Sequence, residues 1–261
     1  MSRAPVMFIS HGSPMFALEP GPAGRLLQQH STELDDVKAM LWVSPHWSTP
    51  DLRISSGAQP ETIHDFGGFP APLYQLEYPV RGAPELAETV RGLLDKAGFS
   101  GQADPRRGLD HGVWVPLLHL RPEADIPVLQ LSLSRQHTLP RLLALGAALS
   151  ALREQGIAII ASGGVTHNLY DIRRDSEQSA AYVQRFQGWL RSRLEGRDSQ
   201  ALLRPDQHNE DFNRAHPTPE HYLPLLIALG ASSVEDRFSV LEGGISHYAL
   251  SMESYLWSGQ E

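Results

Sequence analysis

The chain has 261 residues, of which 41% are hydrophobic, and a formal net charge of −8. This composition excludes a disordered chain and indicates a buried core, and the absence of any Lys/Arg-rich run argues against a nucleic-acid partner. There is no cysteine, which excludes disulfides, thiolate metal sites and cysteine nucleophiles. No apolar run reaches membrane-spanning length and no apolar signal segment precedes the first strand, so we expect a cytoplasmic protein with no membrane partner.

Apolar runs of strand length recur along the chain. Most are rich in β-branched and aromatic residues and contain few polar ones, which is typical of strands buried on both faces. The runs that we predict to be strands are 6–10, 39–44, 52–55, 126–132 and 157–161, with a final strand or hairpin within 236–256.

Helical periodicity and end signals predict the helices that separate these strands. Pro84 suits a first helical turn, Thr218 suits an N-cap and Gly156 suits a helix end. Segment 195–216 is polar and reads as a loop. The predicted helices are 23–30, 84–97, 139–155, 179–194 and 218–229.

Segment 57–83 is rich in glycine and proline but also carries aromatic residues. A long irregular segment in a compact chain is usually a functional loop or a disordered one, and the aromatic residues argue against disorder. We therefore expect an ordered loop packed over an edge of the sheet. Strands alternating with helices predict an α/β fold, and no repeat or linker divides the chain, so we expect residues 1–261 to form one domain.

Three apolar runs each deliver a histidine just past their C-terminal ends, namely His11, His46 and His167. Ligands bind at that edge in open α/β sheets, and imidazole is the commonest protein ligand for zinc, iron and copper. The pattern predicts a metal or acid–base site there. Taken singly, each histidine also suits a local role, as a loop hydrogen-bonding group, a surface residue or a turn cap.

Two further histidines are candidates. His221 lies in the first turn of a predicted helix, where ordinary exposure is the plain alternative, and the neighbouring Glu220 is an equally good ligand that would complete a site of two histidines and one carboxylate. His111 is either oriented by Asp110 or merely part of the same turn. We assign to surface positions or core packing His30, His119, His137, His208 and His247.

Other catalytic motifs are absent from the sequence: there is no Gly-x-Ser-x-Gly elbow, phosphate-binding loop, Gly-x-Gly-x-x-Gly or His-Glu-x-x-His. The residue patterns alone therefore indicate a mononuclear metal site built from histidines at a sheet edge, under an aromatic loop.

Six stretches, in family order and covering nearly the whole chain, resemble the 4,5-DOPA extradiol dioxygenase family, which belongs to the class III extradiol ring-cleaving dioxygenases. The resemblance implies a single-domain three-layer α/β/α sandwich with a central, mostly parallel or mixed sheet. The stretches are 10–15 (SHGSPM), 44–47 (SPHW), 63–70 (IHDFGGFP), 108–114 (GLDHGVW), 165–169 (VTHNL) and 216–225 (HPTPEHYLPL).

The resemblance also implies a metal held by His11, His46 and His221, where the wider class uses two histidines and a glutamate; Glu220 stays open as the third ligand. The implied activity is insertion of O₂ into a substituted, DOPA-like catechol. We expect Fe(II) to be the active metal. Zn(II) is expected to occupy the site readily, because three histidines and a water suit it.

By the same resemblance, His167 is the acid–base residue, and histidine titrates in the right range for that role. His111 is a second acid–base or hydrogen-bonding residue. We expect His64, Asp65 and Phe66 to shape the ring pocket, with Asp65 either meeting a substrate ammonium group or capping a turn.

Two other functions stay open, a zinc-dependent hydrolase and a non-catalytic binding protein on the same fold. The presence of His167 beside three candidate ligands argues against a binding role. The expected partners are a small-molecule catechol and O₂, and the chain is expected to be a monomer or a small homo-oligomer. The sequence names neither the catechol nor the ring bond, 4,5 or 2,3, that is cleaved.

Overall fold

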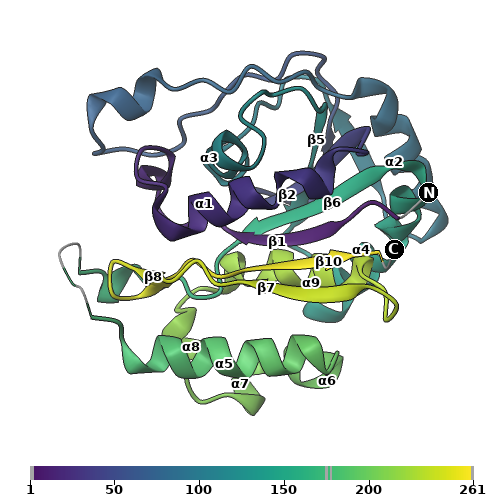
Figure 1. Cartoon of the computed structure of the whole chain (residues 1–261). Coiled ribbons are helices and arrows are strands. Elements are labelled where there is room, and N and C mark those ends of the chain that lie inside the picture. Colours follow the sequence, from purple (N-terminus) through teal and green to yellow (C-terminus); the bar gives the residue numbers. More distant parts are fainter. Residues whose placement is uncertain (1–2, 174–175, 177, 260–261) are drawn as a thin grey trace.

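The computed structural model describes residues 3–173, 176 and 178–259. An eight-stranded mixed sheet lies at its centre (Figure 1). The strands of this sheet are β1 (Val6–Ser10), β2 (Ala39–Thr49), β3 (Leu52–Ser55), β4 (Gly101–Asp104), β5 (Val128–Ser134), β6 (Ile157–Gly163), β7 (Arg237–Leu241) and β10 (Ser254–Ser258). A separate two-stranded hairpin consists of β8 (Ile245–Ser246) and β9 (Leu250–Ser251).

The strand order is β4-β3-β5-β2-β6-β1-β10-β7. The four neighbours β5, β2, β6 and β1 run parallel. At one side β10 is antiparallel to β1, and β7 is antiparallel to β10 and so runs in the same direction as β1; at the other side β3 is antiparallel to β5. The carboxyl ends of the four parallel strands therefore share one edge of the sheet. The predicted α/β class with a mixed sheet is confirmed.

Helices cover both faces of the sheet. The α-helices are α1 (Gly21–Gln29), α2 (Pro84–Lys96), α3 (His111–Leu120), α4 (Leu139–Leu149), α5 (Ala181–Glu195), α6 (Ser199–Leu202), α7 (Pro205–His208), α8 (Phe212–Ala215) and α9 (Leu223–Ala231). The 3₁₀ turns are η1 (Pro14–Ala17), η2 (Ser31–Leu34), η3 (Ala71–Gln75), η4 (Ser150–Gln155), η5 (Leu169–Asp171) and η6 (Pro219–His221). Among the described residues, no helix combines the length and apolar character needed to cross a membrane.

Side chains alternate between the two faces of the sheet along each strand, and they pack into one hydrophobic core on each face. In β1, Met7 and Ile9 pack with α1 and α3 on one face, whereas Val6 and Phe8 pack with α2, α4, α5 and α9 on the other. Figure 1 shows α1 and α3 on one side of the sheet and α5 and α9 on the other. Because successive side chains of a strand point to opposite faces, a wholly apolar run such as β1 suits a sheet covered twice. The three-layer arrangement is confirmed.

Three predictions for helical or loop segments differ from the structure. The predicted helix 218–229 is divided into η6 and α9, and α9 continues to Ala231. Segment 139–155 is not one helix: it divides into α4 and η4, which ends at Gly156 with φ +81°. The prediction of a loop over 195–216 is wrong, since α6, α7 and α8 lie there. Each of these helices has four residues, too few for a periodic pattern, and α6 begins with a local cap in which the Asp198 side chain accepts from Ala201 N–H.

Strand β2 is longer than predicted and irregular. Its pairing with β5 shifts register between Val43 and Ser48, and it continues to Thr49. The irregular stretch contains Pro45, which has no N–H to donate to a neighbouring strand. His46 therefore projects from a bulged part of β2 rather than from a residue past its end.

Segment 57–83 is an ordered loop, as predicted. It packs on the α1–α3 side of the sheet. Leu73 and Tyr78 are buried in that core, and Phe66 and Phe69 pack against it. This loop continues over the carboxyl edge of the parallel strands, where the candidate site lies.

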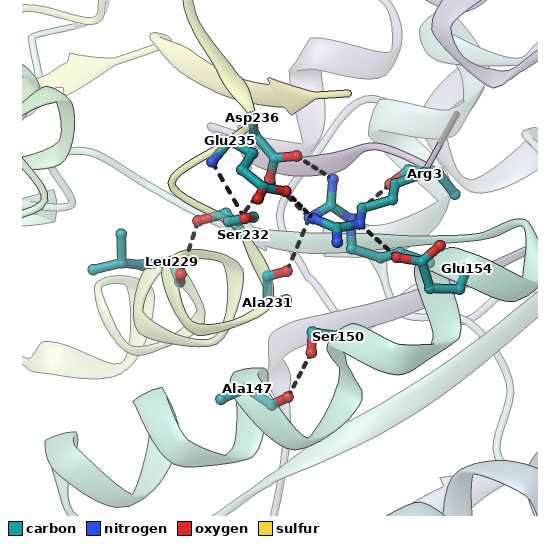
Figure 2. Close-up of polar contacts among 12 residues, drawn as sticks. Arg3, Ala147, Ser150, Glu154, Leu229, Ala231, Ser232, Glu235 and Asp236 are labelled. Carbon is teal, nitrogen blue, oxygen red and sulfur yellow. Dashed lines mark hydrogen bonds and ion pairs between the residues drawn. The ribbon is translucent and has the colours of Figure 1, made fainter. Parts of the chain in front are cut away.

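A cluster of ion-paired residues lies at the opposite end of the sheet, where the parallel strands begin. Arg153 is 2% exposed and pairs with both carboxylate oxygens of Asp236 at 2.7 and 2.8 Å. Figure 2 shows Arg3 nearby, in contact with Glu154 and Glu235. These contacts fix the starts of β1, β6 and β7 and lie away from the histidines at the strand ends.

Candidate functional site

Three histidines converge at the carboxyl edge of the sheet. His11, His46 and His221 each offer a ring nitrogen, and these atoms all lie within 4.8 Å of one another. The Nε2 atoms of His11 and His46 are 3.0 Å apart. Two nitrogens that bind one zinc ion tetrahedrally at 2.0–2.1 Å are about 3.3 Å apart. The donor set and its spacing therefore fit a single metal ion.

His11 directly follows β1. Its Nδ1 lies 2.7 Å from Ser162 Oγ in the neighbouring strand β6, which leaves Nε2 to face the other two histidines. The chain then turns at Gly12, where φ is +60° and where an added Cβ would lie 2.6 Å from Met252 Sδ. The positive φ favours glycine at this turn, and a larger residue would also have to displace the flexible Met252 side chain.

His221 comes from η6, whose backbone lies close to the end of β6. An added Cβ at Gly163 would lie 2.3 Å from the His221 carbonyl oxygen, and Gly164 N–H donates to the same oxygen at 3.0 Å. The small residues after β6 thus permit the close backbone approach that the sequence suggests. His221 is 4% exposed rather than a surface residue, and in the described structure its buried Nε2 has no hydrogen-bond partner.

Glu220 lies on the other nitrogen of His221. Its Oε1 is 3.2 Å from His221 Nδ1 and accepts from Thr218 Oγ1 at 2.9 Å. A carboxylate on Nδ1 fixes the ring tautomer and keeps the Nε2 lone pair free for a metal. The geometry therefore favours His221 as the third ligand and Glu220 as the residue that orients it.

Burial keeps these imidazoles neutral. It lowers the pKa of His46 to about 4 and lowers the pKa values of His11 and His221 below their usual range, and the neighbouring histidines add to the effect. A neutral imidazole is the form that binds a metal, so the site needs little deprotonation near neutral pH.

His167 lies beside this group. Its ring stacks on that of His221 with centroids 3.4 Å apart and 8° between the planes, and its backbone N–H donates to Ala215 O at 2.8 Å. Burial lowers the pKa of His167 to about 4, although the charge of Glu220 opposes the shift. His167 is therefore a neutral base near pH 7. The structure brings it to the same edge as His11, as expected from β1 and β6.

His111 is the first residue of α3, and Asp65 orients it. Asp65 Oδ1 accepts from both the backbone N–H and Nδ1 of His111 at 2.9 Å, and the His111 ring is 3.9 Å from the His46 ring between centroids. Burial would raise the pKa of Asp65, but the hydrogen bonds and charge of His111 outweigh it and lower the pKa to about 2. The alternative that Asp110 orients His111 is wrong, because Asp110 accepts from Gly112 N–H and caps α3.

A cavity of about 550 Å³ opens beside these histidines. Phe66 lines it, whereas His64 and Asp65 are not among its lining residues; His64 Nε2 lies 3.0 Å from Leu76 O. The residues that line the cavity are Gly12, Ser13, Pro14, Met15, Glu19, His46, Phe66, Gly68, Phe69, Pro70, His111, His167, Leu169, Ile172, His221, His247 and Leu250.

The sequence patterns do not identify Glu19 and His247 as residues of the site, although both line the cavity. The sequence assigns His247 to surface or core packing, but the structure places it on the cavity wall. Neither residue follows a predicted strand or belongs to a periodic stretch. The one local signal is the Gly243-Gly244 pair, which marks a turn shortly before His247.

Comparison with known proteins shows the family to which the chain belongs. Residues 5–255 match the catalytic LigB subunit of aromatic ring-opening dioxygenase, and the chain belongs to this family. The chain is 37% identical over 249 residues to the 4,5-DOPA dioxygenase extradiol of Beta vulgaris, covering 92% of this chain and 93% of the relative. It is 36% identical over 256 residues to the 4,5-DOPA dioxygenase extradiol of Escherichia coli (strain K12), covering 97% and 94%.

The fold has a solved counterpart. The crystal structure of an uncharacterized protein from Escherichia coli K12 superimposes with a TM-score of 0.81 at 30% identity, over 97% of this chain and 99% of that chain. The resemblance carried by the six sequence stretches is thus confirmed over nearly the whole chain, together with the fold and the extradiol dioxygenase function that it implies.

Proposed function

We propose that this protein cleaves the ring of a substituted, DOPA-like catechol with O₂ at a single Fe(II) held by His11, His46 and His221. The observation that carries the proposal is the convergence of three imidazoles, two buried and one half-buried, beside two further histidines on one cavity wall; among the described residues, one of the three has an unpartnered Nε2. Relatives named 4,5-DOPA dioxygenase extradiol support the DOPA-like substrate. The whole chain, 1–261, acts as one catalytic domain.

His167 and His111 handle the catechol protons. A catechol must lose hydroxyl protons before both oxygens bind a metal, and His167, neutral at pH 7, takes one of them. His111 donates Nδ1–H to Asp65, so its Nε2 is free to hydrogen-bond the second hydroxyl group. Phe66 contributes an apolar wall for the ring. His64 and Asp65 act through the loop and through His111 rather than by contact with the ring.

His11, His46 and His221 would hold the metal on which the ring cleavage depends. When bound, Fe(II) supplies the redox chemistry that activates O₂, which Zn(II) lacks. Overall, the carbon–carbon bond beside the diol breaks and both atoms of O₂ enter the ring-opened product. Three neutral ligands leave the full positive charge of the metal to attract the catecholate.

Oxygen uptake with simultaneous absorbance scans tests this function. The protein is stripped of metal, reloaded anaerobically with Fe(II) or Zn(II), and mixed with L-DOPA and plain catechols. We expect uptake of one O₂ per catechol and a yellow product with Fe(II) alone. No uptake with any catechol at full iron loading would reject the proposal.

A zinc hydrolase is the second candidate, because three histidines and a water form a catalytic zinc site. Hydrolysis that requires Zn(II), with no oxygen uptake in the iron-loaded protein, would favour it. We also propose that the protein is cytoplasmic and a monomer or small homo-oligomer, and that it acts on small molecules without nucleic-acid or membrane partners.

A further inference from the structure

The active-site cavity adjoins a second, smaller hollow. This hollow of about 150 Å³ lies between the start of α1 and the β8–β9 hairpin. Four residues line both spaces, namely Ser13, Met15, Glu19 and His247. A group bound at these residues is therefore within reach of a ring that occupies the main cavity.

The turn that carries His247 has a disfavoured backbone conformation, and hydrogen bonds hold it in place. His247 and Tyr248 both have positive φ values, 52° and 72°, which non-glycine residues rarely adopt. Their carbonyls accept from Arg173 N–H at 3.0 Å and from Ala180 N–H at 2.9 Å. Residues in such conformations persist where the surroundings over-determine them, and they cluster at functional sites.

Hydrogen bonds also join the hairpin to the segment that carries His167. Thr166, the residue before His167, donates its hydroxyl to Ala249 O at 2.8 Å and accepts from Ser251 N–H at 2.8 Å. Because the hairpin and the residue before His167 share this anchor, the backbone of the turn that carries His247 is held beside the cavity.

The chemistry of the shared wall suits a cation. His247 Nδ1 is buried without a hydrogen-bond partner in the described structure, so Nε2 is the ring atom left for a ligand. Glu19 is exposed, and it is the one Asp, Glu, Lys or Arg among the described residues that line either hollow. A carboxylate and an imidazole nitrogen that accepts a hydrogen bond together fit an ammonium group.

We propose that Glu19 and His247 form the subsite for the ring substituent of a DOPA-like catechol and bind an ammonium group at its end. This specificity rests on the catechol function proposed above. Glu19 supplies the charge, and His247 Nε2 accepts a second ammonium hydrogen.

The test compares three catechols that differ at the end of the side chain: 4-(2-aminoethyl)catechol, 4-ethylcatechol and 3-(3,4-dihydroxyphenyl)propionate. Dissociation constants are measured anaerobically with the Zn(II)-loaded protein, and kcat/KM with the Fe(II)-loaded protein. We expect the amine to bind about threefold to fivefold more tightly than the ethyl compound, and the carboxylate most weakly.

Two substitutions and one control variant test whether Glu19 and His247 cause the preference for the amine. Glu19→Gln should bring the amine-to-ethyl affinity ratio close to one, whereas Glu123→Gln, which removes the same charge from an exposed position outside the cavity, should leave the ratio unchanged. His247→Asn should lower the ratio while the turn survives, because asparagine tolerates positive φ.

The outcomes separate the two proposals. If the iron-loaded protein consumes 4-ethylcatechol but the ratio is the same in wild type and Glu19→Gln, the subsite is wrong and the catechol function stands. If none of the three compounds is consumed or bound, the catechol function itself fails.

Discussion

The imidazole of His167 lies flat on that of His221, 3.4 Å between centroids and 8° from parallel. Stacking does not cover the edges of the rings, and Glu220 lies on His221 Nδ1 while Nε2 has no partner in the described structure, so His221 can bind a metal while His167 exchanges protons beside it. His167→Ala should therefore retain metal but lose about 10²–10⁴-fold in kcat for ring cleavage. Metal content by elemental analysis and oxygen uptake check this; full activity in the variant would remove His167 from the mechanism.

Glu220 and His221 should differ sharply in their effect on metal binding. His221→Ala removes a proposed ligand and should abolish stoichiometric binding, whereas Glu220→Gln removes a group that orients the ring and should weaken affinity by about 10–100-fold. Competition with a chromophoric chelator measures both constants. A total loss of binding in Glu220→Gln, with binding kept in His221→Ala, would make the carboxylate the third ligand.

Asp65 acts on turnover through His111. Asp65→Ala removes the negative charge and the oxygen that accepts both hydrogen bonds from His111, so the ring is no longer fixed with Nε2 facing the cavity. We expect kcat to fall by about 10–100-fold, with a small change in KM and an unchanged metal content. A variant whose KM rises while kcat is constant would instead indicate direct contact between Asp65 and the substrate.

His216 should make the metal-free protein sensitive to acid. Burial lowers the pKa of His216 to about 4, while its Nε2 lies 2.9 Å from Val165 O. Between pH 6.5 and 4 the unfolded chain binds a proton that the folded chain does not, so stability falls as pH falls. From pH 7.5 to 5 this group accounts for about 2 kcal/mol.

Replacement of His216 tests this contribution. In His216→Gln, which keeps a donor for Val165 O, the free energy of unfolding by urea should fall with pH by about 2 kcal/mol less than in wild type. Equal falls in the two proteins would contradict the assignment.

Gly163 controls the approach of η6. In Gly163→Ala the added Cβ would lie 2.3 Å from the His221 carbonyl oxygen, so η6 must move. We expect a loss of about 1–3 kcal/mol in stability and weaker metal binding. Gly188→Ala is the matched control, because its Cβ meets nothing within 4 Å and alanine favours the helix interior. Equal behaviour of the two variants in thermal unfolding and metal titration would contradict the packing argument.

Local patterns were sufficient to predict the strands β1 and β6 and the edge at which His11 and His167 meet. A wholly apolar run followed by a histidine needs no knowledge of the rest of the chain. His221 was harder, because its burial depends on a glycine pair that lies far away in the sequence. The resemblance to a family, rather than the pattern around His221, identified it as a candidate ligand.

What escaped prediction depends on tertiary contacts or on very short elements. The pairing of Asp65 with His111 joins a loop to a helix start, and nothing near Asp65 in the sequence favours His111 over another partner. The bulge that aims His46 arises from the register between β2 and β5. His247 reaches the cavity through two positive φ values that neither of its turn residues would be expected to adopt.

The position of β1 has a consequence for biosynthesis. β1 is synthesised long before both of its neighbours, since it pairs with β6 and with β10, which ends at Ser258. Until then a five-residue apolar segment has no partner, and contacts of such long sequence separation form slowly. We therefore expect the nascent chain to need protection by chaperones. Metal loading should follow release of the finished polypeptide, because the segment that carries His221 is also made late.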